Sequence, residues 1–377
     1  MSDDADRPAI AYLTTYYTGD IDGRLGRFHD WVHRLRDRPD PPFDAEVHAF
    51  TVGTPDGMLA ETPKGVLGGG GDLWGRRRNK LEFLLHFPRI RRSLRRSDFD
   101  LLHLIQLDTI LFPTGAIRRE EPVIVGPDIL GWNPIRSGGR WDLKFPASLF
   151  TRSKYELKRI LAATAWYDAA TAYSEYHRRM LERLGIPRED VTVLPPGVDP
   201  RFAPNERRLA RGPTHLLYVG DISAHKGFPT LVEALDQLEH EVQLTVIGAG
   251  EPPRALPESV EFLGFIHRAN LPRYYRRADI YVTPSIDEAG PNTVVEALAS
   301  GVPVVATDRP GLNAYPPEDA CVLFDPRAPD ALASAIDRAI DKLPRLTCAA
   351  RRQANDFDID RVLDSLDSLC RRCINKG

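Results

Sequence analysis

Cysteine is rare in this sequence, and the four cysteines in 377 residues are too few for a disulfide framework. Cys370 and Cys373 form a C-x-x-C pattern near the end of the chain. No second Cys or His pair lies nearby, and the pattern does not follow an expected strand. We therefore interpret the two as reduced thiols rather than as a zinc or redox site.

Long apolar runs are missing as well. No uninterrupted apolar stretch approaches the length of a membrane span, and residues 1–8 are acidic and lack the apolar core of a secretory signal. We therefore expect a cytoplasmic protein.

Neither sign of charge dominates the chain. The 50 Lys and Arg residues are balanced by 53 Asp and Glu residues, and this balance argues against a nucleic acid partner. The composition that is present, 42% hydrophobic and 27% charged residues, is typical of a folded globular protein. The length predicts two domains.

Strand and helix patterns alternate in the second half of the chain, as a parallel sheet with crossover helices requires. Short β-branched runs predict strands at 216–219, 243–247, 260–263, 280–283 and 302–306. Helices are expected between them at 227–238, 270–278 and 293–300. This half therefore predicts a Rossmann-like domain.

The first half shows the same alternation more weakly, with strands expected at 10–13, 46–51, 101–105 and 123–125. We therefore predict an α/β protein with two doubly wound domains. Pro195-Pro196-Gly197 and the polar stretch after it indicate a linker, which places the domains at 1–205 and 206–355. Residues 356–377 carry apolar side chains at helical spacing and predict a C-terminal helix.

The segment 280–305 contains the clearest candidate site. An expected strand ends there in a loop with Gly290, Pro291, Asn292 and Thr293, and a helix follows directly. Ligands of open α/β sheets bind at the carboxyl ends of strands. The N–H groups and the positive dipole end of a helix N-terminus suit an anion such as a diphosphate. The loop therefore predicts a phosphate-binding site.

Two carboxylates flank this helix N-terminus. Glu296 lies about one turn into the helix, where its carboxylate is able to accept hydrogen bonds from two adjacent hydroxyls, such as those of a ribose. Glu288 lies in the loop and would face another part of the ligand. An isolated pair of glutamates is commonly surface charge, so the argument depends on their place beside the helix N-terminus.

Glu288, seven further residues, Glu296 and the run Ala297 to Val305 resemble the E-x7-E signature of the GT4 family, which comprises retaining glycosyltransferases with the GT-B fold. Other segments resemble the family in the same order. They are the interdomain turn at 195–199, the glycine-to-lysine phosphate loop at 218–227, the next strand and turn at 246–250, and the base-contacting segment at 260–266. The likeness covers about residues 190–325 well and the N-terminal domain thinly.

The resemblance implies a GT-B architecture, in which two Rossmann-like domains face a central cleft and the last helix crosses back to the N-terminal domain. It also implies a site for a nucleotide-sugar donor on the C-terminal domain. Glu296 would bind the ribose, Glu288 would contact the donor sugar, and Ile266 would lie beside the base. Gly220, Asp221 and Lys226 would belong to the donor-binding phosphate loop, in which Lys226 neutralises the diphosphate.

The activity implied by this resemblance is transfer of a hexosyl group from a nucleotide-diphosphate sugar to a glycan, lipid-linked or small-molecule hydroxyl, with retention of configuration. Cleavage of the sugar C1–O bond leaves negative charge on the nucleoside diphosphate, which Lys226 and the helix end would stabilise. In this family a phosphate oxygen is thought to take the proton of the attacking hydroxyl. A dedicated catalytic base is then not strictly required. The nucleotide sugar is a substrate, so we expect no resident cofactor. Without a His or Cys cluster, or an Asp-x-Asp triplet that ends an apolar strand, we also expect no required metal.

Two positions depart from the family pattern. Asp221 stands where an arginine usually follows the glycine of the phosphate loop, and His225 or Arg309 is a candidate for the missing positive charge. Pro127 stands where the N-terminal domain normally offers a histidine, which leaves Asp128 as the candidate catalytic residue there.

Gly23 belongs to a glycine-containing loop after the first strand, which resembles the family's turn that lets acceptor and phosphate approach. His103 lies in a segment like the family's and fits either a core position or a site position.

The departures at Asp221 and Pro127 keep a second class open, a GT-B protein that binds a nucleotide sugar or glycan without transferring it. Residues 74–96 interleave Arg and Lys with apolar side chains, which fits peripheral contact with the inner membrane face or a domain helix with a solvated arginine face. The Asp-x-Asp triplets at 20–22, 98–100 and 356–358 do not end apolar strands, so they do not predict a metal site.

Overall fold

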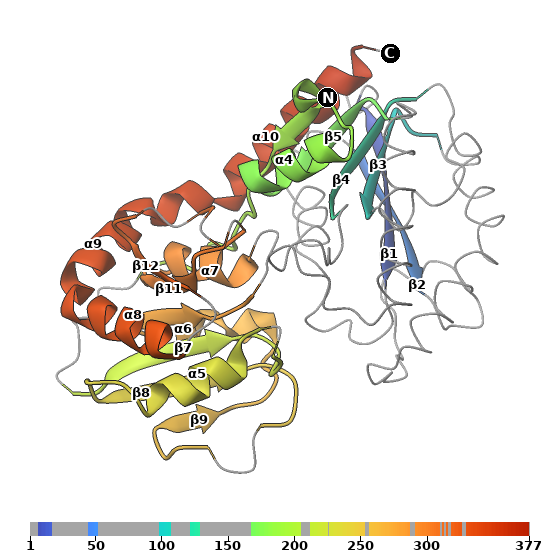
Figure 1. The fold of residues 1–377 in the computed structure, drawn as a ribbon. Coiled ribbons are helices and arrows are strands. Elements are labelled where there is room, and N and C mark those ends of the chain that lie inside the picture. Colours follow the sequence, from blue (N-terminus) through green and yellow to red (C-terminus); the bar gives the residue numbers. More distant parts are fainter. Residues whose placement is uncertain are drawn as a thin grey trace, which may run out of the picture.

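The computed structural model describes residues 7–16, 44–51, 98–106, 121–128, 167–204, 212–224, 226–252, 256–286, 291–309, 311–312, 314–315, 318–325 and 329–376. Within these residues the chain forms two parallel six-stranded sheets (Figure 1). Gly23, His225, Glu288 and Gly290 and the basic stretch 74–96 lie outside the described residues.

The first sheet has the strand order β2-β1-β3-β4-β5-β6, and every neighbouring pair is parallel. Its strands are β1 (Ala9–Tyr16), β2 (Asp44–Thr51), β3 (Leu101–Gln106), β4 (Val123–Asp128), β5 (Ala169–Ala172) and β6 (Val191–Val193). Helix α4 (Glu175–Arg183) follows β5, and the 3-10 turn η5 (Arg188–Asp190) precedes β6. The predicted strands of this half are confirmed, and β5 and β6 were not anticipated.

The second sheet has the order β12-β11-β10-β7-β8-β9, which is the Rossmann order read from one edge. Its strands are β7 (Thr214–Val219), β8 (Val242–Ile247), β9 (Val260–Phe262), β10 (Ile280–Thr283), β11 (Val304–Thr307) and β12 (Cys321–Phe324). Its helices are α5 (Phe228–Leu235), α6 (Pro272–Tyr275), α7 (Asn292–Ala299), α8 (Pro329–Asp341) and α9 (Leu343–Gln353), with the 3-10 turn η6 (Arg268–Asn270) before α6.

The largest differences from the predicted boundaries in this half concern one strand and one helix. The strand expected at 302–306 begins at Val304, because Pro303 has no N–H for the ladder and the Val302 N–H closes α7 by donating to the Ala297 carbonyl at 2.9 Å. The helix expected at 270–278 is the four-residue α6. Pro272 starts it because proline suits the first helical turn.

Alternating side chains of the second sheet pack into two hydrophobic cores, one on each face. Leu217 and Tyr281 face a cluster that includes α7 residues, whereas Leu216, Ile280 and Val282 face a cluster that includes residues of α5 and α8. Successive side chains of a strand point to opposite faces. Helices therefore cover both faces, as a doubly wound domain requires.

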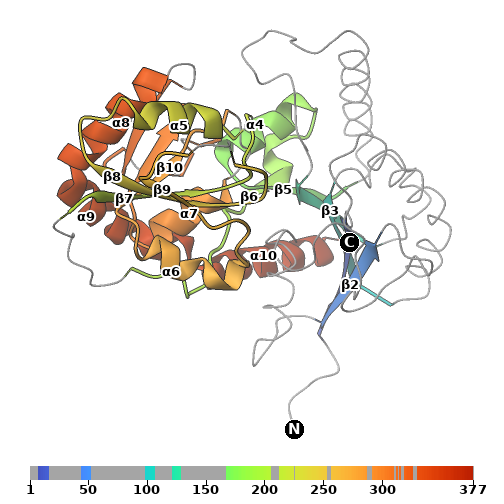
Figure 2. The same cartoon turned by 90° about the horizontal axis from the view of Figure 1, so that it is seen from below.

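The C-terminal helix α10 (Ile359–Ile374) packs on the first sheet, although it follows the second sheet in the chain. Figures 1 and 2 show it in red, extending from the second sheet to the first. Its buried residues Leu363, Leu366 and Leu369 share a core cluster with Ile10 of β1 and Leu101 of β3. The 3-10 turn η7 (Ala354–Phe357) precedes it, and the Phe357 carbonyl accepts from the Val198 N–H at 2.9 Å.

The C-x-x-C pattern lies in this packed surface of α10. Cys370 and Cys373 are free thiols buried in the cluster that joins α10 to the first sheet. Burial raises the pKa of both thiols, which disfavours the reactive thiolate. Their environment is that of small core residues.

We expect Leu363→Ala to destabilise the first sheet by about 2–5 kcal/mol, since Leu363 is 0% exposed and its removal leaves a cavity between α10 and the sheet. All five tryptophans lie between residues 31 and 166, so urea unfolding followed by tryptophan fluorescence reports on the first half of the chain. Ser365→Ala, on the exposed side of α10, is the matched control. An unchanged fluorescence transition for Leu363→Ala would contradict this account of α10.

Candidate functional site

Three connections meet at the carboxyl edge of the second sheet. Gly227, after β7, has a φ of +70°, and a Cβ built on it would lie 2.0 Å from the carbonyl oxygen of Pro284, after β10. The Thr307 hydroxyl, at the end of β11, donates to the Ser285 carbonyl at 2.7 Å. The turn that carries Lys226 therefore touches the loop after β10, which in turn is bonded to the end of β11.

The turn after β7 also lies against the turn after β8. A Cβ on Gly248 would lie 1.7 Å from the Gly220 carbonyl oxygen, so only glycine fits there. Asp221 is exposed, and its backbone carbonyl accepts from the Tyr218 hydroxyl at 2.8 Å. The Lys226 N–H donates to the Ser223 hydroxyl at 3.3 Å. These bonds shape the predicted phosphate loop around its one lysine.

Helix α7 begins at the same edge. Pro291 is its N-cap residue, Asn292 and Thr293 open its first turn, and no side chain caps it within the described residues. The first N–H groups of an α-helix have no acceptor inside the helix. Together with the dipole they form a positive end directed toward the carboxyl edge, which suits an anionic ligand.

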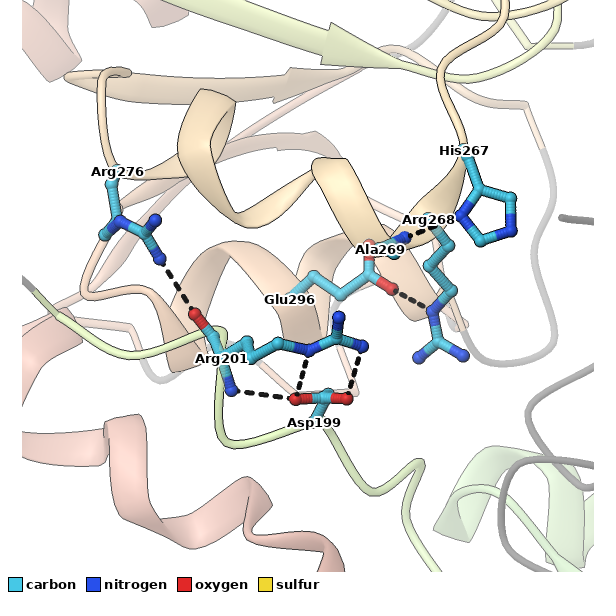
Figure 3. Close-up of polar contacts among 7 residues, drawn as sticks. All are labelled: Asp199, Arg201, His267, Arg268, Ala269, Arg276 and Glu296. Carbon is cyan, nitrogen blue, oxygen red and sulfur yellow. Dashed lines mark hydrogen bonds and ion pairs between the residues drawn. The ribbon is translucent and has the colours of Figure 1, made fainter. Parts of the chain in front are cut away.

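Glu296 lies on α7 (Figure 3), and this carboxyl side chain belongs to a residue that is only 3% exposed. Its Oε1 accepts from Arg268 Nε at 3.3 Å, and its Oε2 accepts from the Tyr275 hydroxyl at 3.0 Å. Arg268 comes from η6 and Tyr275 from α6. Three elements therefore converge on one carboxylate.

Tyr275 is itself held between two aromatic rings. The Phe202 ring meets it edge-on at a centroid distance of 5.6 Å, and the Tyr281 ring of β10 lies at 5.8 Å. Such aromatic pairs fix ring orientation. The direction of the Tyr275 hydroxyl toward Glu296 is thus set by packing.

The turn after β6 is hydrogen-bonded to the segment that carries Tyr275. Asp199 accepts from Arg201 Nε at 3.0 Å and from a terminal guanidinium nitrogen of Arg201 at 2.8 Å (Figure 3). The Arg201 carbonyl accepts from the Arg276 guanidinium at 2.9 Å. The predicted interdomain turn is therefore bonded to the segment that carries Tyr275.

Arg309 follows β11 at the same edge. Its N–H donates to the Thr307 carbonyl at 2.8 Å, and its carbonyl accepts from the Leu312 N–H at 2.9 Å. Its Nε is buried and has no hydrogen-bond partner among the residues that the structure describes. A buried donor without an acceptor is costly, so the position of Arg309 favours an anionic ligand.

The first sheet offers fewer described candidates. Asp128 ends β4, at the carboxyl edge of that sheet, but its side chain lies outside the described part of the structure. His103 of β3 is buried and its Nε2 hydrogen-bonds the Gly126 carbonyl at 2.9 Å. Burial lowers its pKa to about 4, so His103 is neutral near pH 7 and occupies a core position.

The structure thus places Lys226, Pro291, Asn292, Thr293 and Glu296 along the edge of one sheet. Ile266 lies between β9 and η6, two residues before Arg268, and packs against the cluster that contains α7. Arg268 and Tyr275 were missed because nothing in their local sequence marks a charge or hydroxyl that faces a residue far along the chain.

Two of the Asp-x-Asp triplets have structural roles. Asp100 accepts from the Ala9 N–H at 2.7 Å, and Asp358 accepts from the Asp360 N–H at the start of α10 at 2.9 Å. Across the described residues, no three His, Cys, Asp or Glu side chains form a group that could hold a metal. Among these described residues, no helix combines the length and the apolarity of a membrane span.

We expect Gly227→Ala to destabilise the protein more than Gly185→Ala, when the free energy of unfolding is measured by urea denaturation with circular dichroism. Both glycines have positive φ, which costs about 1–2 kcal/mol for alanine, but only at Gly227 would the Cβ also meet backbone. Equal losses of unfolding free energy in the two variants would show that a Cβ at Gly227 does not collide with the Pro284 backbone.

Two protein families match the sequence. The family described as "Glycosyl transferases group 1" matches residues 213–342, and "Glycosyltransferase Family 4" matches residues 29–202. A D-inositol 3-phosphate glycosyltransferase of Geodermatophilus obscurus is 32% identical over 241 residues, which are 56% of this chain and 52% of that protein. The chain therefore spans about half the length of the curated relatives it matches.

Solved structures are similar over nearly the whole chain. Sucrose-phosphate synthase from Thermosynechococcus elongatus superposes with a TM-score of 0.76 at 19% identity, over 98% of this chain and 100% of that one. Anabaena HepE in complex with UDP and glucose gives a TM-score of 0.69 at 17% identity, over 97% of this chain and 100% of that one. At these identities the likeness shows the fold, which is the GT-B architecture expected from the sequence.

Proposed function

Because the chain belongs to the group 1, GT4-type glycosyltransferases, we propose that it transfers a hexosyl group from a nucleotide-diphosphate sugar to a hydroxyl acceptor with retention of configuration. The acceptor class in this proposal is a glycan, a lipid-linked sugar or a small hydroxylated molecule. HepE, whose fold is similar, has been crystallised with UDP and glucose, which supports a nucleotide-sugar donor.

The observation that carries the proposal is the meeting of three features at one sheet edge. The Lys226 turn touches the loop after β10, the N-terminus of α7 opens at that loop, and Glu296 lies one turn further along α7. A cation and a helix N-terminus suit a diphosphate, and a carboxylate suits the hydroxyls of the ribose linked to it.

In this proposal each group acts on one part of the donor. Glu296 accepts hydrogen bonds from the ribose hydroxyls, and Ile266 lies beside the base. Gly220 allows close approach of the phosphate loop. Lys226 and the α7 N-terminus, with Asn292 and Thr293, bind the diphosphate.

Positive charge near the diphosphate stabilises the group that leaves during the reaction. When the sugar C1–O bond breaks, its electron pair stays on the nucleoside diphosphate and an oxocarbenium-like charge develops on the ring. Preorganised donors stabilise that leaving charge without reorganisation. A phosphate oxygen takes the proton of the acceptor hydroxyl, which bonds to C1 from the face that the diphosphate leaves.

Glu288, Asp128 and Gly23 have proposed roles in the same reaction. Glu288 contacts the donor sugar, Asp128 approaches it from the first domain, and Gly23 allows the acceptor to approach. We further propose that the reaction needs no resident cofactor or metal. A cytoplasmic location, with peripheral contact of residues 74–96 with an anionic membrane, is part of the same proposal.

The proposal predicts that incubation with UDP-, GDP- and ADP-sugars and sugar or lipid acceptors releases the nucleoside diphosphate from one donor, as measured by mass spectrometry. Release should be lost in Lys226→Ala and Glu288→Ala, because the first loses the cation at the leaving group and the second a contact with the sugar. Glu296→Ala should bind the donor much more weakly. Saturable binding without turnover would instead favour a protein that binds nucleotide sugars without transferring them.

Arg309 provides a second test of the diphosphate site. Arg309→Gln should weaken binding of the nucleoside diphosphate about tenfold, equal to about 1.4 kcal/mol, since it removes a charge-assisted bond. Binding of the matching nucleoside monophosphate should change little. Arg338→Gln, on the exposed side of α8, is the control in the calorimetric titrations. Equal weakening for both nucleotides would place Arg309 away from the terminal phosphate.

A further inference from the structure

We infer that Arg268 is a positioning residue that acts through Glu296, and that it sets the preference of this protein for ribonucleotide over 2′-deoxyribonucleotide ligands. The inference rests on the proposed function, in which Glu296 binds the ribose. It adds a residue that the E-x7-E pattern does not contain.

Both oxygens of Glu296 are already oriented by the protein. Arg268 Nε lies 3.3 Å from Oε1 and the Tyr275 hydroxyl 3.0 Å from Oε2. An ionised carboxylate offers about four lone-pair positions, which is enough to accept from Arg268, from Tyr275 and from two ligand hydroxyls. Two protein donors, one on each oxygen, fix the plane in which the ligand hydroxyls are met.

Glu296 and Arg268 form a largely buried ion pair. The Glu296 side chain is 4% exposed and the Arg268 side chain 20% exposed, so the pair is largely removed from water. A buried carboxylate is tolerated when a cation and further hydrogen bonds compensate it. Arg268 supplies the cation and Tyr275 the neutral hydrogen bond. Without Arg268, the carboxylate would be more stable when it faces water. It would then turn away from the ribose hydroxyls.

Arg268 and Tyr275 are both held in place by their own surroundings. The His267 ring Nδ1 accepts from the Ala269 N–H at 3.2 Å, which caps η6 and fixes the backbone of Arg268 (Figure 3). Tyr275 is clamped between Phe202 and Tyr281. Figure 3 shows the Arg268 side chain directed at Glu296 from the η6 side. Loose side chains would not preorganise an acceptor, whereas these are constrained.

The consequence for specificity follows from geometry. A site that accepts hydrogen bonds from both ribose hydroxyls discriminates against the analogue that lacks one, because the buried carboxylate then loses one of the donors it would otherwise have. The rejection depends on the carboxylate staying in position. If Arg268 holds it there, loss of Arg268 should lower affinity for the ribonucleotide and spare the deoxyribonucleotide.

Calorimetric titration with UDP, GDP and ADP first identifies the base, and the matching 2′-deoxynucleoside diphosphate is then compared. In the unchanged protein we expect at least about tenfold tighter binding of the ribonucleotide. Arg268→Gln should bind the ribonucleotide about tenfold more weakly and bring the ratio close to one, and Arg268→Lys should restore part of it. Tyr275→Phe, which keeps the clamped ring, should shift the ratio in the same direction.

Matched controls lie a few residues along the same segment. Arg273 is exposed and stacks on the Tyr274 ring, and its guanidinium donates to the Tyr274 hydroxyl at 2.9 Å. Arg273→Gln and Tyr274→Phe should therefore leave the ribonucleotide-to-deoxyribonucleotide ratio unchanged. A ratio that falls equally in the controls would indicate a general loosening of α6 and overturn the inference.

A double-mutant cycle with Glu296→Gln separates action through Glu296 from direct contact with the ligand. The inference requires that Arg268→Gln cause no further loss when Glu296→Gln is already present. Additive losses would mean that Arg268 binds the ligand itself, and the inference would be wrong.

Failure of the proposed function and failure of the inference would give different titration results. If the unchanged protein binds none of the three nucleotides, the donor proposal falls and the inference falls with it. If it prefers the ribonucleotide and Arg268→Gln keeps that preference, only the inference falls.

Discussion

The arrangement of the site depends on one backbone contact, the approach of the turn after β7 to the loop after β10. A Cβ at Gly227 would lie 2.0 Å from the Pro284 carbonyl oxygen, so the two connections touch without an intervening side chain. This contact places Lys226 beside the loop that leads into α7. Through the bond between Thr307 and Ser285 it also ties in the end of β11. Parallel strands make this possible because their carboxyl ends share one edge.

A second dependence joins the two halves of the chain. Helix α10 completes the core of the first sheet, and the Val198 N–H bonds the Phe357 carbonyl where the chain crosses between the sheets. The Tyr315 hydroxyl, from the connection after β11, donates to the Tyr173 carbonyl at the end of β5 at 2.6 Å. The connection that carries Arg309 is therefore bonded to the first half of the chain, so the two sheets are linked close to the proposed donor site.

The charged residues around the proposed donor site lie at other positions than the family resemblance implies. Asp221 occupies the usual arginine position and is exposed, where water screens its charge. Positive groups come instead from other connections of the same sheet, with Arg268 on Glu296 and Arg309 after β11. A net charge of -3 for the whole chain gives no indication of this local arrangement.

The sequence by itself determined the fold class, most strands of both sheets and the loop-to-helix motif with Glu296, because apolar alternation and turn residues are local signals. It did not place β5, β6 or β12, which are short and lack a distinctive pattern. Glu288, Gly290, Gly23 and His225 remain predictions from the sequence. Only the tertiary structure decided which side chains face Glu296. Arg268 and Tyr275 lie 28 and 21 residues away from it, and such pairing follows from packing rather than from any local pattern.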